Sequence, residues 1–122
     1  MPTKMKRPKI CKAKSIKAKT GCGNLYITIG YDNGNPIEVF ATLGKAGGCS
    51  HCQNEALTRA ISLGLKYGVP IKEYVDELEG LGCPNPHLYP EEEKTLSCPD
   101  ALAKILKENS DGNFESNLKE DP

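Results

Sequence analysis

The 122-residue sequence contains no tryptophan, and only seven of its residues are phenylalanine or tyrosine. Its core must therefore be built from Leu, Ile, Val and Ala side chains. No apolar run approaches the roughly 20 residues that a membrane-spanning helix needs. In a secretory signal a basic N-terminus is followed by an apolar stretch. The basic N-terminus of this sequence is not. These absences predict one soluble, cytoplasmic domain.

Acidic residues are absent from residues 1–20, which hold eight of the sixteen basic residues. The segment from Glu91 onward holds nine of the sixteen acidic residues. The sixteen basic and sixteen acidic residues cancel to a net charge of zero, but the two signs are segregated along the chain. We accordingly divide the chain into a basic N-terminal arm (1–19), a domain (20–109) and an acidic flexible tail (110–122). The two ends could meet each other, a neighbouring subunit or a polyanion, or could simply be solvated. Nucleic acid is not the partner that this balance favours.

Two short β-type runs precede the helical part of the sequence. Residues 25–29 are rich in β-branched side chains, and residues 37–43 alternate apolar and polar. The Asn33-Gly34 pair between them is a strong hairpin signal. Ile37, Val39, Ala41 and Leu43 share one face of the second strand, which predicts that this face meets the core. Because an isolated hairpin is marginally stable, we expect further strands or a homodimer.

Three helices follow in the pattern. The first starts near Ser50, and two apolar rows are expected to face the core: Ala56, Ala60 and Leu63, together with Leu57, Ile61 and Leu65. A second starts near Pro70, with Ile71, Tyr74, Val75 and Leu78 at helical spacing. A third starts near Pro99 with Ser97 as a candidate N-cap. The predicted fold class is α+β, a β-hairpin or small antiparallel sheet packed against two to three helices.

Five segments of the sequence resemble the TSCPD domain. They are TGCGNLYITI (20–29), EVFATLGKAGGC (38–49), EALTRAISLGL (55–65), GLGCPNP (80–86) and LSCPDALAKIL (96–106). That module lies near the C-terminus of adenosylcobalamin-dependent (class II) ribonucleotide reductases and also forms small stand-alone proteins. It lacks the catalytic barrel, the cobalamin site and the radical cysteine of the reductase. The resemblance therefore implies a non-catalytic accessory or regulatory module whose partner is a class II reductase.

The resemblance carries over four of the six cysteines: Cys22, Cys49, Cys83 and Cys98. Each stands beside Gly or Pro at the end of an expected element, and such ends can converge into a tetrahedral thiolate site. Zinc is the cofactor we expect, with an iron–sulfur cluster or simply buried thiols as alternatives.

Cys52 is ambiguous. It could be an additional or alternative ligand, or it could form a dithiol couple with Cys49 at the start of a helix, which would make the chain a thiol oxidoreductase. The βαβ context of a thioredoxin-like motif is missing. His51 and His87 are expected to be surface residues.

The glycine-rich turn at residues 44–48 suggests another function, nucleotide binding or sequestration. A turn that leads into a helix N-terminus offers backbone N–H groups to a phosphate. The candidate residues are Lys45, Gly47 and Gly48, with Arg59 further along the helix. The order of a Walker motif is absent. Because the sequence contains no complete catalytic constellation, we do not expect an enzyme.

Overall fold

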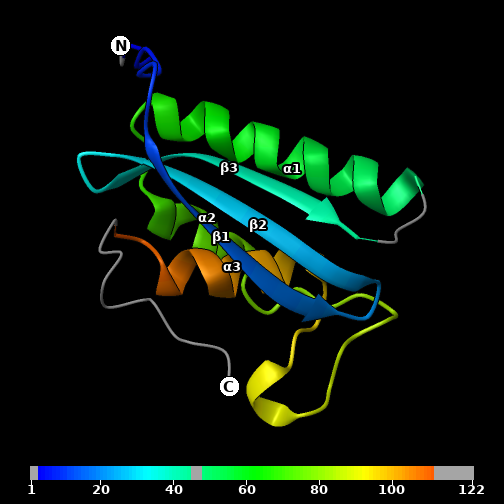
Figure 1. The fold of residues 1–122 in the computed structure, drawn as a ribbon. Helices are drawn as coiled ribbons and strands as arrows, with labels where there is room; N and C mark the ends of the chain where they lie inside the picture. The colour runs from blue at the N-terminus through cyan, green and yellow to red at the C-terminus, as the bar shows by residue number, and fades with distance from the viewer. Residues whose placement is uncertain (1–2, 45–47, 112–122) are drawn as a thin grey trace.

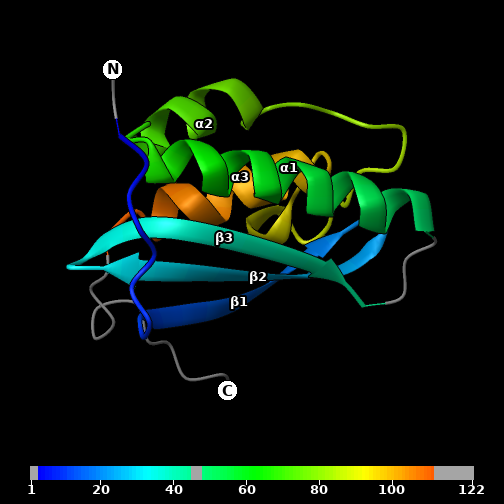
Figure 2. The ribbon, with the colours of Figure 1, turned by 90° about the horizontal axis from the view of Figure 1, so that it is seen from above.

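The computed structural model describes residues 3–44 and 48–111. Three strands, β1 (Lys12–Thr20), β2 (Gly23–Asp32) and β3 (Asn35–Leu43), form an antiparallel sheet in the order β1-β2-β3. The helices α1 (Gly48–Lys66), α2 (Ile71–Leu78) and α3 (Cys98–Glu108) follow, with a short 3-10 helix, η1 (Glu91–Glu93), before α3. All three α-helices lie on one side of the sheet (Figures 1 and 2). The predicted α+β class is confirmed.

The hairpin between β2 and β3 turns where the Asn-Gly signal predicts. Asn33 and Gly34 both have positive φ, at 51° and 80°, and Asp32 pairs with Asn35 across the turn. Two successive positive φ angles characterise the turn type whose twist matches that of the flanking strands. The four residues predicted for the inner face of β3 are all buried: Ile37, Val39, Ala41 and Leu43.

The sheet extends into the basic segment. Residues 12–20 pair with β2 along their whole length, from Lys12 opposite Tyr31 to Thr20 opposite Gly23. Ile16 and Ala18 pack against the core, while Lys17 and Lys19 are exposed. A sheet of three strands stabilises a hairpin that would be marginal alone. The predicted acidic tail lies outside the described residues from residue 112 onward.

The core fills the space between the sheet and the helices. Its largest fully buried apolar side chains come from β2, β3, α1 and α3: Leu25, Ile27, Ile29, Val39, Ile61, Leu102 and Leu106. In α2, Val75 is buried, and Ile71, Tyr74 and Leu78 pack against the core as predicted. The core is mostly aliphatic, as the scarcity of aromatic residues requires, and Tyr31 is the one buried aromatic side chain among the described residues.

One predicted row of α1 is wrong. Ala56, Ala60 and Leu63 are exposed, with Leu63 at 52%, whereas Ile61 and Leu65 are buried and Leu57 is half-buried. The buried face continues toward the N-terminus through Asn54 and Thr58 instead. These polar side chains bond to carbonyls one turn back: Asn54 Nδ2 donates to Ser50 O at 2.9 Å, and Thr58 Oγ1 donates to Asn54 O at 3.0 Å. Bonds within the helix allow these two polar side chains to be buried, and Asn54 also interacts with the thiol of Cys98.

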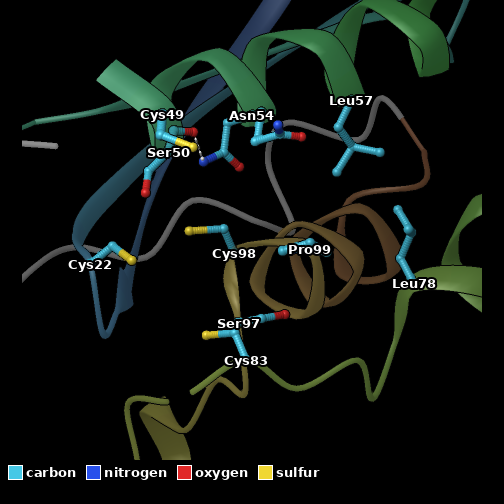
Figure 3. Close-up of a pocket in the computed structure, with 11 residues that line it drawn as sticks. Cys22, Cys49, Ser50, Asn54, Leu57, Leu78, Cys83, Ser97, Cys98 and Pro99 are labelled. Atoms are coloured by element: carbon cyan, nitrogen blue, oxygen red, sulfur yellow. Dashed lines mark hydrogen bonds between the residues drawn. The ribbon is translucent and has the colours of Figure 1, made fainter. Parts of the chain in front are cut away.

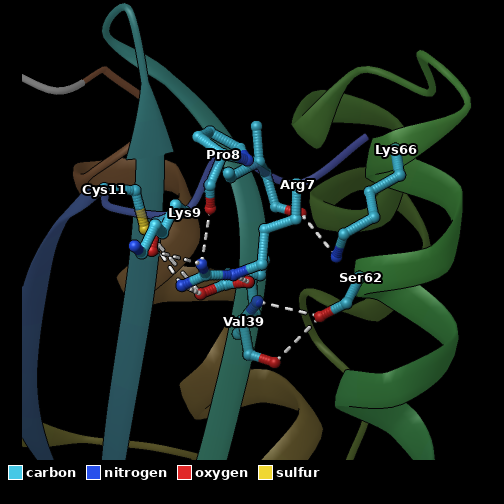
Figure 4. Close-up of polar contacts among 9 residues, drawn as sticks. Arg7, Pro8, Lys9, Cys11, Val39, Ser62 and Lys66 are labelled. Atoms are coloured by element: carbon cyan, nitrogen blue, oxygen red, sulfur yellow. Dashed lines mark hydrogen bonds and ion pairs between the residues drawn. The ribbon is translucent and has the colours of Figure 1, made fainter. Parts of the chain in front are cut away.

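The segment before β1 is fastened to β3 and to the end of α1 (Figure 4). Met5 N donates to Lys66 O at 2.7 Å, and Arg7 binds both carboxylate oxygens of Glu38, at 2.7 and 3.0 Å. The bond from Arg7 holds the pKa of Glu38 below its ordinary value. A bidentate guanidinium–carboxylate pair fixes direction as well as distance, so this segment crosses the sheet at a defined place.

Candidate functional site

The four predicted cysteines line one pocket of about 370 Å³. They come from four separate segments: Cys22 from the β1–β2 turn, Cys49 from the first turn of α1, Cys83 from the loop after α2, and Cys98 from the first residue of α3. Figure 3 shows them placed around a common space, with Leu57 and Leu78 along one side. Residues up to 76 positions apart in the sequence are therefore brought to one site.

The β1–β2 turn is organised by the hydroxyl of Thr20, which is buried. Thr20 Oγ1 donates to Gly23 O at 2.8 Å and accepts from Cys22 N at 3.2 Å. The same oxygen lies 3.8 Å from Cys98 Sγ. One hydroxyl thus orders the turn that carries Cys22 and links it to the start of α3.

The loop that carries Cys83 packs directly on this turn. Asn85 Nδ2 donates to Gly21 O at 2.6 Å, and Asn85 N lies 3.4 Å from Cys83 Sγ, which accepts its hydrogen. Residue 21 must be glycine for this contact, because a Cβ there would overlap the backbone carbonyl of Asn85. The backbone of Cys83 is also held, since its N–H donates to Leu96 O at 3.0 Å.

Ser97 and Asp100 tie both ends of the same loop to α3. Ser97 is the N-cap: its hydroxyl accepts from Asp100 N at 3.1 Å and donates to Leu81 O at 2.6 Å. The carboxylate of Asp100 is fully buried and accepts from the N–H groups of Gly80 and Leu96, both at 2.8 Å. These bonds place Cys83 and Cys98 on the same side of the pocket.

The sequence profile of the TSCPD domain matches residues 2–110. The chain belongs to the TSCPD domain family. Two relatives are vitamin B12-dependent ribonucleotide reductases: one from Bradyrhizobium diazoefficiens is 38% identical over 77 residues, which is 62% of this chain and 6% of the relative. The other, from Agrobacterium fabrum, is 38% identical over 61 residues, which is 49% of this chain and 5% of the relative. No solved structure is significantly similar.

The serine, cysteine, proline and aspartate of the motif that names the family are residues 97–100, at the start of α3. In this TSCPD domain the four residues have distinct roles. Ser97 caps α3, Cys98 faces the pocket, and Asp100 binds the loop before the helix. Pro99 lies in the first turn of α3, where a backbone N–H would have no partner within the helix. Burial would raise the pKa of Asp100. The bonds from Leu96, Gly80 and Lys104 outweigh it and hold that pKa below its ordinary value.

All the cysteines of this TSCPD domain are free thiols. Burial raises the pKa of the Cys98 thiol, so at neutral pH it is protonated and is a poor nucleophile. Within residues 3–44 and 48–111, no three His, Cys, Asp or Glu side chains are grouped closely enough to hold a metal ion. The four thiols thus line the same pocket, but they would have to move closer together to coordinate one metal ion.

Cys52 does not line this pocket. It lies in the exposed part of the first turns of α1, as does His51, whereas Cys49 faces the pocket. The remaining cysteine, Cys11, precedes β1; it is also outside the set that lines the pocket, and its Sγ lies 3.9 Å from Glu38 Oε2. Cys11 and Cys52 therefore serve as internal controls for the four pocket cysteines.

The residues predicted for phosphate binding do not gather in the part of the chain that the structure describes. Gly48 begins α1, and Arg59 lies eleven residues further along the same helix, where it pairs with Glu55 at 3.3 Å. That separation is about 16 Å at 1.5 Å per residue. Lys45 and Gly47 lie outside the described residues. None of the described helices is both long and apolar enough to cross a membrane.

Proposed function

We propose that this TSCPD domain is a non-catalytic accessory module that assists or regulates an adenosylcobalamin-dependent ribonucleotide reductase, and that it binds zinc through Cys22, Cys49, Cys83 and Cys98. The single observation that carries the zinc part is the common pocket of these four thiols. The reductase part rests on the family and on the relatives' names.

The extent of the similarity supports an accessory role rather than a catalytic one. The chain spans about one twentieth of the length of the curated reductases it matches. A module of this kind is suited to act by contact with the reductase.

The chemistry of the pocket supports zinc over harder ions. Four thiols are a soft donor set, and Zn²⁺ binds cysteine sulfur at about 2.3 Å in a tetrahedral site. Cys49 stands at the exposed start of α1, while Cys22, Cys83 and Cys98 are held by the hydrogen bonds of Thr20, Asn85 and Ser97. Cys49 is therefore the ligand that we expect to complete the set last.

Metal binding would also change the state of Cys98. A thiol must lose its proton to coordinate, so affinity for zinc should rise with pH. Because burial raises the pKa of Cys98, this thiol should still release a proton on binding at neutral pH. Bound zinc would replace the Thr20 contact as the link between the β1–β2 turn and α3. The site would then be structural and would rigidify the end of the sheet.

The reductase part is tested with the purified class II ribonucleotide reductase of the same organism. Its turnover should change, and the two proteins should co-elute on gel filtration, when the intact chain is added. A Gly21→Ala variant, which disturbs the pocket, should act more weakly than a Gly82→Ala variant, whose Cβ would meet open space. Unchanged turnover together with separate elution would refute the partnership.

A further inference from the structure

None of the described helices covers the side of the sheet away from α1, α2 and α3 (Figure 2). Strand alternation places on it a set of residues that we call the open face: Ser15, Lys17 and Lys19 from β1, Asn24, Tyr26 and Thr28 from β2, and Phe40 and Thr42 from β3. All except the half-buried Thr28 are exposed. At one end of this side of the sheet, the side chain of Glu38 packs over Gly30 and is held by Arg7. The rest of the open face is a surface that the described helices do not cover.

Two aromatic residues on adjacent strands, Tyr26 and Phe40, are exposed on the open face. Tyr26 and Phe40 are 42% and 54% exposed. Tyr26 pairs with Thr42, and Phe40 pairs with Thr28, so the two residues are diagonal neighbours on adjacent strands, and the backbone positions of such neighbours are about 7–8 Å apart. The Tyr26 ring lies toward Gly44, so each ring offers a separate surface for stacking. Nucleic-acid bases stack on aromatic side chains arranged in this way on sheets.

Positive charge borders the rings. Lys17 is directly opposite Tyr26, and Lys19 is opposite Asn24 on the same pair of strands. Glu38 is neutralised by Arg7, and Glu93 forms an ion pair with Lys19 at 3.1 Å in which both side chains are nearly half exposed. Glu92 and Glu108 line a pocket together with Lys17 and Lys19, to which Lys94 and Lys104 also contribute. An exposed pair such as that of Lys19 and Glu93 contributes little free energy, so a phosphate can take the place of Glu93.

A cavity of about 400 Å³ lies at the end of the open face, where Tyr26 forms part of its lining. Lys19, Asn24 and His87 also line it. The Nε2 atom of His87 is buried and has no hydrogen-bond partner, alone among buried side-chain nitrogen and oxygen atoms of the described residues. An unpaired buried ring nitrogen is costly, and a turn of the His87 ring would bring this atom to a polar ligand in the cavity.

We propose that the open face binds a single-stranded nucleic acid. Its bases stack on Tyr26 and Phe40, its phosphates lie along Lys17 and Lys19, and the edge of one base enters the cavity toward Asn24 and His87. The zero net charge of the whole chain argues against such a partner. The fold changes that conclusion, because β1 brings lysines from the acid-free part of the sequence alongside two exposed rings.

Binding of a fluorescently labelled 20-nucleotide oligo-dT to the intact chain, followed by anisotropy at low salt, tests the proposal. Loss of one base–aromatic stack removes about 1–3 kcal/mol, so Tyr26→Ala and Phe40→Ala should each weaken binding roughly 5- to 150-fold. Tyr67→Ala is the matched control, because Tyr67 is 41% exposed but lies beyond α1. It should leave the affinity unchanged.

Two further variants separate stacking from charge. Tyr26→Trp should restore binding, and its indole, the only one in the chain, should be quenched when oligo-dT is added. Lys17→Ala should reduce the slope of log K against log salt by about 0.7, whereas Lys72→Ala on α2 should not alter it.

Three results would overturn the proposal. These are absence of binding at low salt, equal affinity for duplex DNA, and insensitivity of binding to Tyr26→Ala and Phe40→Ala. A dimer that dissociates in both variants during sedimentation would instead assign the open face to a second copy of this chain. Binding should persist in a chelator, so its outcome is independent of the zinc proposal.

Discussion

Replacing Asp100 by Asn tests whether the buried carboxylate of the family motif holds the pocket together. The side chain keeps its shape, but one of its two acceptor oxygens becomes an NH₂ group that faces a backbone N–H. Either Gly80 N or Leu96 N then loses its partner inside the protein. The ion pair to Lys104, at 3.1 Å, is lost as well.

The magnitude follows from burial. A hydrogen bond to a charged group contributes about 1.5–3 kcal/mol, and a buried donor left unpaired costs about 1–3 kcal/mol. We expect Asp100→Asn to lower the free energy of unfolding by about 2–4 kcal/mol, because the side chain is fully buried. For a domain of this size the change corresponds to a decrease in Tm of roughly 8–16 °C.

Thermal and urea unfolding followed by circular dichroism provide the assay. Asp76→Asn is the matched control, because Asp76 also pairs with a lysine one turn away, Lys72, but in an exposed position. It should change stability by no more than about 0.5 kcal/mol. Equal effects of the two substitutions, or an Asp100→Asn effect below 0.5 kcal/mol, would refute the structural role assigned to the carboxylate.

The same carboxylate predicts a pH dependence. Its folded-state pKa lies below the ordinary value of about 3.9, so its contribution to stability is present above about pH 4. That contribution is lost as the pH falls through the folded-state pKa. The acid loss of stability should therefore be shallower in Asp100→Asn than in the natural chain.

Two other predictions concern single side chains. Tyr31→Phe should cost about 0.5–1.5 kcal/mol, because the buried Tyr31 hydroxyl donates to Asn109 O at 2.6 Å. Burial raises the pKa of Tyr31 to about 12, so the natural chain should lose stability between about pH 10 and pH 12 in urea titrations and the variant should lose less. Gly21→Ala should destabilise the domain by about 1–3 kcal/mol through its overlap with Asn85, and Gly82→Ala should be nearly neutral in the same unfolding assay.

Local signals predicted much of the fold. The Asn33-Gly34 turn, the alternation of β3, the Ser97 cap and the spacing in α2 each depend on neighbours in the sequence, and each is confirmed. Strand β1 was harder to predict, because lysines at alternate positions resemble a solvated arm. Only its pairing with β2 shows why Ile16 and Ala18 lie where they do.

The buried face of α1 shows where periodicity fails. Two apolar rows were available, and the row of Ala56, Ala60 and Leu63 is exposed because Asn54 and Thr58 occupy the buried side instead. Such polar residues count against burial unless their bonds to the helix's own carbonyls are known. Tertiary packing, which chooses between two such rows, is not encoded in spacing alone.

The pocket shows the same division. The resemblance identified Cys22, Cys49, Cys83 and Cys98, and the structure brings all four to one pocket. The resemblance did not identify the structural roles of Thr20 and Asp100, although the Ser-x-x-Asp spacing at 97–100 is that of a capping box. Their roles depend on contacts to Cys98 and Gly80, 78 and 20 residues away.

The zinc content of the anaerobically purified, chelator-free protein, measured by mass spectrometry, tests the central claim most directly. We predict about one zinc per chain, lost in Cys22→Ser, Cys83→Ser and Cys98→Ser and retained in Cys11→Ser and Cys52→Ser. A metal-free natural chain that does not take up added zinc, or zinc that persists in all three pocket variants, would contradict the assignment. Bound iron with visible absorption would assign the site to an iron–sulfur cluster and not to zinc. A Cys49–Cys52 disulfide in a metal-free chain would favour thiol chemistry instead.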